Sequence, residues 1–128
     1  RGLGLLDVST EMSADKRLAR VPARHAATGL DVEGYEIHIG RTSGADCDRP
    51  FAYIDHAPEG ATSCDGKVMG SYLHGLFVSD SFRGAFLERL GIRASALNYD
   101  LRVDQALEAL ADHCERYIDV DGLLALAE

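Results

Sequence analysis

The amino-acid sequence predicts one α/β domain over residues 1–128, with strands in the first part of the chain and helices after them. Apolar and polar side chains alternate over residues 30–42, and a period of two is typical of a strand. After residue 77 the apolar residues recur with helical spacing instead. A chain of 128 residues can bury one hydrophobic core but is too short for two ordinary domains.

Five strands are predicted before the helices. Pro22 limits the second strand to an edge or an end of a sheet, because proline lacks a backbone N–H. The polar segments STEMSAD and 42–49 predict loops, and Asp65-Gly66 predicts the turn of a hairpin connection. The predicted strands cover residues 3–9, 16–23, 30–42 and 51–55, and a run that ends at Leu73.

The last part of the chain is predicted to be helical. Ser79 or Ser81 can cap a helix that Gly91 ends. A second helix presents one apolar face, with acidic and other polar residues opposite. A short helix follows over residues 119–128. The apolar face of the second helix consists of Val103, Leu107, Leu110, Cys114 and Tyr117.

Composition and charge exclude several classes of function. The net charge of −8 argues against binding to nucleic acid or to an anionic membrane surface, since both require clustered Lys and Arg. No apolar stretch approaches the roughly 18 residues of a membrane span. Three cysteines without paired spacing fit a reducing compartment, so we expect a cytoplasmic protein. The abrupt apolar start at Arg1 leads us to expect a fragment or an excised domain, although processing produces the same start.

His74 is the first candidate for chemistry. It follows the predicted strand that ends at Leu73 and precedes Gly75, and α/β sheets place ligand crevices at such strand ends. An imidazole there suits general-base chemistry or activation of a thiol. The alternative from position alone is a histidine that caps a turn.

Glu36 and His38 are a second candidate pair, because side chains two residues apart on a strand share a face. They can line a site. They can equally form a solvent-exposed face, with Tyr35, Ile37 and Ile39 in the core, and the pattern leaves both interpretations open.

The remaining candidates are weaker. Cys114 lies on an apolar helix face and is expected to pack in a core, while Cys47 and Cys64 lie in polar loops without a nucleophile elbow. No spacing of Cys or His predicts a metal site. Three further histidines are expected at the surface: His25, His56 and His113.

Several segments together resemble the C-terminal half of cobyric acid synthases, in the same order and at similar spacing. The resemblance covers residues 2 to about 90 and is looser in the helical tail. It implies part of a class I glutamine amidotransferase (flavodoxin-like) domain, with a mixed sheet followed by C-terminal helices. The segments are GLGLLDVSTEM, KRLARV, GYEIHIGRT, DGKVMGSYLHGLF and DSFRGAFL.

The resemblance implies a function. Cobyric acid synthases use glutamine and ATP to amidate side-chain carboxylates of a corrinoid in cobalamin biosynthesis. His74 matches the family histidine that takes a proton from a cysteine thiol and passes it to departing ammonia. Glu36 and His38 match a strand near the glutamine pocket, and Arg17 is a weaker candidate for holding the glutamine carboxylate. No cofactor is expected in this chain, and ATP and Mg²⁺ are expected in an N-terminal synthetase domain.

Two departures from the pattern of class I amidotransferases matter. Leu76 stands where most of them carry the glutamate that orients the histidine, which implies a Cys-His dyad, as in the cobyric acid synthase group. The glycine-rich elbow that holds the nucleophilic cysteine is absent from the sequence, so we expect the 128-residue chain alone not to hydrolyse glutamine. A sheet without its first strands exposes edges and apolar faces, which favours self-association.

Two other functions fit the residues. One is a related amidotransferase that acts on peptidoglycan precursors with a separate ligase partner, and GYEIH with YLHGLF favours the corrinoid enzyme over it. The other is a non-catalytic amidotransferase-like module that binds a partner.

Overall fold

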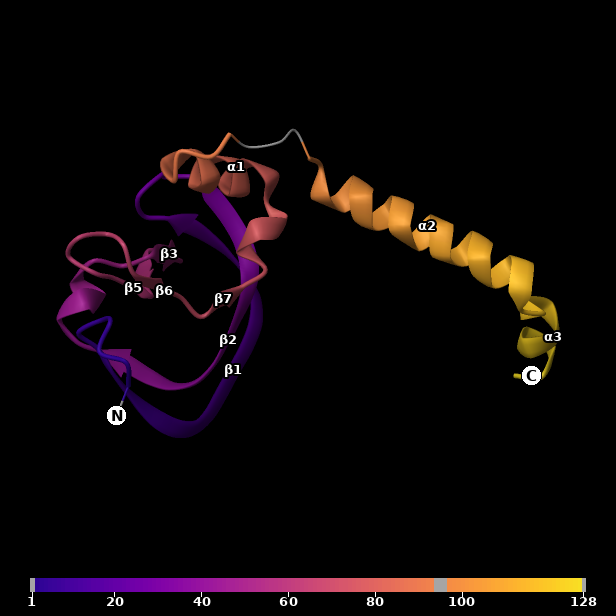
Figure 1. The fold of residues 1–128 in the computed structure, drawn as a ribbon. Helices are drawn as coiled ribbons and strands as arrows, with labels where there is room; N and C mark the ends of the chain where they lie inside the picture. The colour runs from indigo at the N-terminus through magenta and orange to yellow at the C-terminus, as the bar shows by residue number, and fades with distance from the viewer. Residues whose placement is uncertain (1, 94–96, 128) are drawn as a thin grey trace. The chain divides into compact units, whose positions relative to one another are not determined.

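A computed structural model describes residues 2–93 and 97–127, and the chain divides into two compact units, Arg1–Ala94 and Ser95–Glu128. The first unit contains the strands and helix α1, and the second contains α2 and α3 (Figure 1). The elements are β1 (Ser9–His25), β2 (Asp31–Ser43), the 3₁₀ helix η1 (Ala45–Asp48), β3 (Ala52–Ile54), β4 (Ala57–Glu59), β5 (Ala61–Thr62), β6 (Met69–Gly70), β7 (Leu73–His74), the 3₁₀ helix η2 (Leu76–Val78), α1 (Asp80–Arg89), α2 (Tyr99–Tyr117) and α3 (Val120–Ala125).

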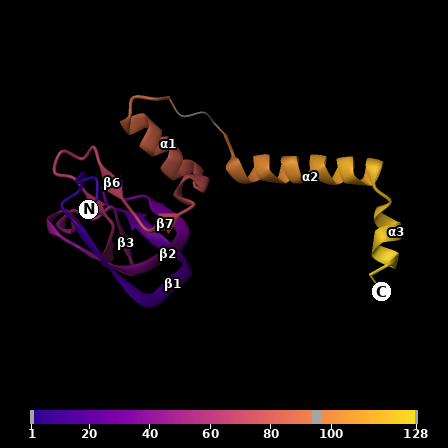
Figure 2. The ribbon, with the colours of Figure 1, turned by 60° about the horizontal axis from the view of Figure 1, so that its bottom comes forward.

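The main sheet of the first unit has the strand order β4-β3-β1-β2-β7, and β5 and β6 form a separate pair. The pairings are antiparallel. β1 and β2 form one long curved hairpin, and α1 lies near one end of it (Figures 1 and 2). A sheet followed by C-terminal helices confirms the predicted α/β class, and the described strands pair in antiparallel fashion where the resemblance implied a mixed sheet.

The start of β1 differs from the prediction. Residues 3–8 form no strand, and the STEMSAD segment is part of β1 instead of a loop. The far end of β2 supplies a partner for this polar segment, where Thr10 faces Thr42 and their hydroxyls lie 2.7 Å apart. A register shift between Glu11 and Lys16 then lets the rest of β1 pair with β2. The start of this strand is determined by its pairing with a distant part of the chain, which the composition of the segment alone does not predict.

Other strand predictions agree with the structure. Residues 16–23 lie inside β1, and β2 and β3 fall within the predicted runs 30–42 and 51–55 with an error of one residue. Pro22 faces Glu33 of β2, and the pairing of β3 with β1 begins only at Arg24. Within the described residues, β1 therefore has a neighbouring strand on only one side at Pro22. No described strand on the other side requires a hydrogen bond from the N–H that proline lacks.

The predicted loop over 42–49 is a more ordered connection than expected, because it contains η1. Asp46 in η1 is buried, and its Oδ2 accepts a hydrogen bond from the backbone N–H of Asp7 at 2.7 Å. The Asp46 carboxylate also forms an ion pair with Arg49. A carboxylate that satisfies two donors ties the start of the chain to this connection.

The core of the first unit lies between the β1–β2 hairpin, β3, β7 and α1. Phe82 of α1 is completely buried, and its ring contacts those of His25, Phe51, Phe77 and Phe86. The wider core consists of Val21, Ala23, Val32, Phe51, Ala52, Ile54, Leu73, Leu76 and Phe82.

The prediction that His25 lies at the surface is wrong. Its side chain is 1% exposed, because it follows Val21 and Ala23 on the inward face of β1. Its ring packs 4.8 Å from Phe51, and its Nδ1 lies 2.8 Å from the hydroxyl of Thr28. Burial lowers the pKa of His25, and the nearby Arg89 charge lowers it further, so the neutral ring is favoured in the fold.

Helix α1 has the predicted boundaries. Ser79 is the N-cap, and its hydroxyl accepts from the backbone N–H of Phe82. At the other end Gly91 has a φ of +74°, its N–H donates to Glu88, and the N–H of Ile92 donates to Leu87. This pair of bonds is the Schellman ending that glycine favours.

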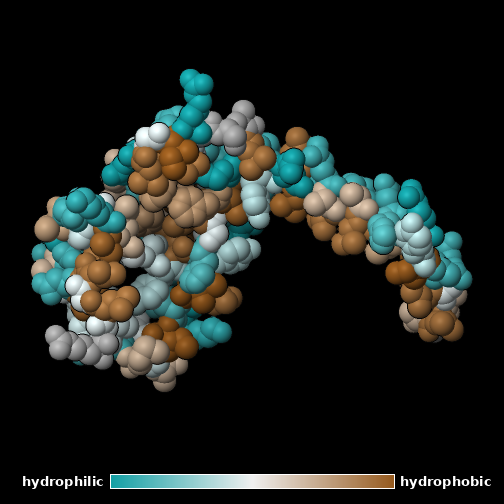
Figure 3. All heavy atoms as spheres, in the orientation of Figure 1, coloured by the Kyte–Doolittle hydropathy of each residue, from teal (hydrophilic) through white to brown (hydrophobic). Residues whose placement is uncertain are grey.

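The second unit consists of α2 and α3. The predicted apolar face of α2 is present, and Leu107, Leu110 and Tyr117 are exposed on it while Cys114 is half-buried. Figure 3 shows apolar side chains gathered along these helices. Among the described residues, none of the helices combines the length and apolar character that crossing a membrane requires.

The aromatic core gives a stability test. Phe82→Ala should lower the free energy of unfolding by about 3–5 kcal/mol, since it removes a fully buried ring that four others contact. Phe77→Ala is the control, because Phe77 is 49% exposed and its loss leaves a smaller cavity. Urea denaturation followed by circular dichroism measures both. Equal costs for the two variants would contradict the assignment of Phe82 to the centre of the core.

Candidate functional site

His74 lies at the end of β7, where the strand pairs with β2. Tyr35 faces His74 and Glu36 faces Leu73 across this ladder. Because residues directly opposite each other project to the same face of a sheet, His74 shares a face with Tyr35. Leu73 points to the buried side, and the imidazole of His74 is exposed. The strand end therefore presents this histidine on the outer face of the hairpin.

The backbone orients the His74 ring. Its Nδ1 lies 3.0 Å from the carbonyl oxygen of Tyr72, and a carbonyl can only accept a hydrogen bond. The proton of the neutral ring is thus assigned to Nδ1, and the lone pair to Nε2. No residue of the described ranges bonds to Nε2. The same Tyr72 carbonyl accepts from the N–H of Ile37 at 3.0 Å, which fixes it to β2.

Two glycines permit this arrangement. A Cβ added to Gly34 would lie 2.7 Å from the carbonyl oxygen of His74, so only glycine lets β7 approach β2 at this point. Gly75 follows His74 with a φ of +83°, a left-handed conformation that favours glycine, and the chain turns there into η2. Gly34 therefore permits the close contact of the two strands, and Gly75 permits the turn directly after His74.

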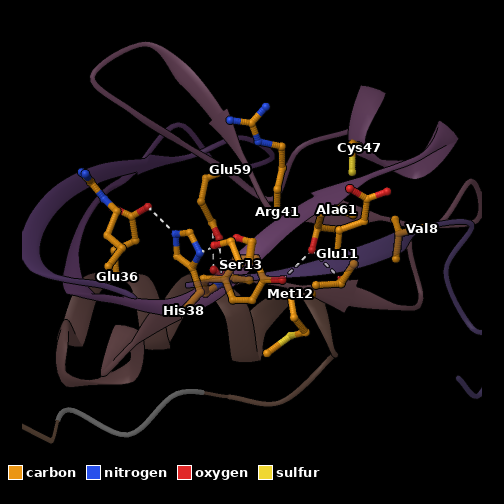
Figure 4. A pocket seen from close by; sticks show the side chains of 18 of the residues that line it. Val8, Glu11, Met12, Ser13, Glu36, His38, Arg41, Cys47, Glu59 and Ala61 are labelled. Carbon is orange, nitrogen blue, oxygen red and sulfur yellow. Dashed lines mark hydrogen bonds and ion pairs between the residues drawn. The ribbon is translucent and has the colours of Figure 1, made fainter. Parts of the chain in front are cut away.

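A pocket of about 1220 Å³ lies on the opposite face of β2, between the hairpin and residues 58–61 and 70–72. Figure 3 shows the first unit hollowed there, and Figure 4 shows Glu36 and His38 pointing into it. The structure thus supports the interpretation that these two side chains line a cavity. The alternative, a solvent face with Tyr35 and Ile39 in the core, is wrong, because Tyr35 and Ile39 are half exposed.

Glu36 connects the predicted candidates on this face. Its carboxylate forms an ion pair with Arg17 from β1 and lies 3.1 Å from Nε2 of His38. The other nitrogen of His38 lies 3.0 Å from the carbonyl oxygen of Gly40, and its ring stacks on Tyr72 at 4.6 Å. Arg17, Glu36 and His38 are therefore brought together on one face of the sheet, but His74 of β7 projects from the other face.

Glu59 belongs to this region and was not found by sequence reasoning. Its Oε1 accepts from the backbone N–H of Tyr72 at 2.6 Å, and its Oε2 accepts from the hydroxyl of Ser71 at 2.9 Å. Burial raises the pKa of Glu59, those two hydrogen bonds lower it in part, the nearby Glu36 charge raises it and His38 lowers it. No motif marked this residue, because β4 brings it to Ser71 and Tyr72 only in the fold.

The two cysteines of the first unit are not bonded to His74. Cys47 lines the pocket and Cys64 is exposed, and among the described residues of this unit neither bonds to His74. Cys114 is half-buried in the second unit. Within the same residues, no three His, Cys, Asp or Glu side chains gather as ligands for a metal ion.

Comparison with known proteins identifies the class. Residues 1–82 match the model of a glutamine amidotransferase domain. The chain belongs to the CobB/CobQ-like family of these domains. It is 64% identical over 126 residues to the cobyric acid synthases of Cereibacter sphaeroides and Rhodobacter capsulatus, and 61% identical to that of Bradyrhizobium diazoefficiens. These matches cover 98% of this chain but 26% of the length of each relative. The predicted resemblance is confirmed.

Gly34 provides a test of the β2–β7 contact. Gly34→Ala should push β7 away from β2 and lower the free energy of unfolding by about 1–3 kcal/mol, the usual cost of overpacking. Amide hydrogen exchange at Ile37 should accelerate, because its acceptor is the Tyr72 carbonyl. Gly2→Ala is the control, since no atom lies within 4 Å of the added Cβ. Unchanged exchange at Ile37 in Gly34→Ala would argue against the contact.

Glu59 gives a pH test. Its pKa is raised above the ordinary 4.5, so the folded state binds the proton more tightly than the unfolded state. Glu59 should therefore add stability as the pH falls through the raised pKa towards 4.5, and Glu59→Gln should lack this increment. Urea denaturation at a series of pH values measures the difference between the two proteins. A difference that does not change with pH would show that Glu59 is not held in this environment.

Proposed function

We propose that the chain supplies the histidine base of a glutaminase in a protein that amidates corrinoid side-chain carboxylates with glutamine and ATP, in cobalamin biosynthesis. The observation that carries the proposal is the exposed His74 ring, whose Nδ1 is fixed on the Tyr72 carbonyl while Nε2 has no hydrogen-bond partner among the described residues. Membership in the glutamine amidotransferase family supports the reaction, and relatives named cobyric acid synthase support the corrinoid substrate over peptidoglycan precursors.

The chemistry assigned to His74 is proton transfer at Nε2. The ring takes the proton of a cysteine thiol, and the thiolate adds to the side-chain amide carbon of glutamine. The imidazolium then gives this proton to the departing nitrogen, which leaves as ammonia, and a glutamyl thioester remains. His74 next takes a proton from water, whose oxygen attacks the thioester, and returns it to the sulfur. Glutamate and the free thiol result.

Ammonia then reacts with a carboxylate that ATP has activated. We assign ATP and Mg²⁺ to a synthetase part of the protein, on the basis of the similarity of this chain to cobyric acid synthases. The chain spans about a quarter of the length of its relatives, which leaves room for such a part in proteins of that kind.

The thiol is proposed to approach from the outer face of the hairpin. Leu18, Tyr35 and Ile39 are exposed on β1 and β2 there, on the same face of the sheet as His74. An apolar surface of this kind is covered in a complete domain. We propose that another part of the protein covers it and brings the cysteine. The chain alone would then lack the nucleophile, and its uncovered apolar face would favour self-association.

Glu36, His38 and Arg17 receive a different role from the one first expected. Direct contact with the glutamine that meets His74 is not favoured, because these side chains leave β2 on the opposite face. The Arg17–Glu36 ion pair, the 3.1 Å contact between Glu36 and His38, and the stacking of His38 on Tyr72 stabilise β2 and the residue that precedes β7 on the pocket face. We propose that they hold the strand that positions His74.

His74→Ala in the complete protein tests the proposal. Amidation with glutamine should fall about 10²–10⁴-fold, the usual contribution of a general base, while amidation with added ammonia should persist. His113→Ala is the control, because His113 is exposed on α2. The ammonia produced from glutamine and the amidated product are measured separately. Full glutamine-dependent activity in His74→Ala would overturn the assignment of the base to His74. If the unmodified complete protein showed no glutamine-dependent activity, a non-catalytic module would be favoured instead.

A further inference from the structure

We infer that Glu59 and Ser71 are positioning residues for His74, and that they act through the peptide group between Tyr72 and Leu73. This inference rests on the proposed function of His74. It supplies a partner for a histidine that lacks the usual acid, since Leu76 occupies that position.

A continuous chain of hydrogen bonds joins the carboxylate to the imidazole. The Ser71 hydroxyl donates to Oε2 of Glu59 at 2.9 Å, and the N–H of Leu73 donates to the Ser71 oxygen at 3.0 Å. That N–H and the carbonyl of Tyr72 belong to one peptide group, and the carbonyl accepts from Nδ1 of His74 at 3.0 Å. In the pocket view, the Glu59 side chain lies near that of His38 (Figure 4).

The direction of these bonds matters. Each donor in the chain points towards the carboxylate, so the dipoles of the hydroxyl, the peptide and the imidazole N–H are aligned. Hydrogen bonds in such a series polarise one another, and a charged acceptor strengthens the first of them. The negative charge of Glu59 thereby increases the negative charge on the Tyr72 carbonyl. That carbonyl stabilises the imidazolium that forms when Nε2 takes a proton.

Glu59 is also fixed in position. Its second oxygen accepts from the N–H of Tyr72 at 2.6 Å, so the carboxylate holds the segment that precedes His74 at two points. The groups that face it are the Glu36 carboxylate and the His38 ring of β2. Glutamine has the same shape but one acceptor oxygen in place of two, so Glu59→Gln can still accept from the Tyr72 N–H while its amide nitrogen donates to the Ser71 oxygen. The substitution keeps contacts with both residues, but it removes the charge and reverses the direction of the Ser71 bond.

The same chain of bonds occurs a second time without a histidine at its end. The Ser63 hydroxyl donates to Asp65 at 2.7 Å and accepts from the backbone N–H of Val68 at 3.0 Å. Substitutions at Ser63 and Asp65 remove equivalent bonds from the same unit. They are matched controls for Ser71 and Glu59, because their peptide group does not contact His74.

The test compares Glu59→Gln and Ser71→Ala with Asp65→Asn and Ser63→Ala in the complete protein. The first two should lower kcat with glutamine about tenfold, the difference between a charged and a neutral hydrogen bond, and leave KM for glutamine unchanged. Amidation with added ammonia should be unaffected in all four and reports that the protein is folded. Labelling histidine with ¹⁵N measures the fraction of neutral His74 that carries its proton on Nδ1, which should fall in the first two variants only.

The outcomes separate this inference from the proposed function. Unchanged kcat and an unchanged Nδ1 fraction in Glu59→Gln and Ser71→Ala would overturn the inference, while activity lost in His74→Ala would keep the proposed function. Activity retained in His74→Ala would overturn both. An equal loss in Ser63→Ala and Asp65→Asn would also overturn the inference, because it would reveal a general effect on stability. Loss of ammonia-dependent activity in Glu59→Gln would mean that this variant is misfolded. Ser71→Ala leaves the carboxylate in place, and its kcat and Nδ1 fraction alone would then test the inference.

Discussion

The backbone of Tyr72 is the constraint on which this structure depends. Its N–H is held by Glu59, its carbonyl accepts from both Ile37 and His74, and its ring stacks on His38. A backbone carbonyl has no side-chain torsion and is fixed once its strand is fixed. It is therefore a rigid acceptor for an imidazole on an exposed strand end, where a flexible carboxylate would lose more conformational entropy on being ordered. The orientation of His74 follows from main-chain geometry more than from a dedicated third residue.

Strand β2 separates two environments. On one face Glu36 and His38 bond to each other within the pocket, and on the other face Tyr35 and Ile39 lie exposed together with His74. The polar side chains support the strand from behind, and the apolar face remains for another surface. Because successive residues of a strand alternate between faces, a shift of one residue in the β2–β7 register would turn His74 to the face that carries Glu36 and His38. Gly34 favours the observed register, because its lack of a Cβ allows the backbone of β7 to approach β2 closely at this position.

Local rules predicted most of the elements. The alternation in β2, the Ser79 cap and the Gly91 ending are encoded by neighbouring residues, and they agree with the structure. Long-range pairing was less accessible, so the first strand was placed too early and His25, which lies between two phenylalanine rings, was assigned to the surface. His74 was found because a histidine at a strand end is visible in the sequence. Glu59 was not, since twelve residues separate it from Ser71 and only the fold joins them.

The central claim is that His74 activates a thiol that lies outside this chain's own cysteines. The most direct measurement is labelling of the complete protein with an electrophilic glutamine analogue, followed by mass spectrometry to locate the modified residue. The account predicts one modified cysteine that is none of Cys47, Cys64 and Cys114, with a labelling rate that falls in His74→Ala. Modification of one of those three cysteines, or a rate that does not depend on His74, would contradict it.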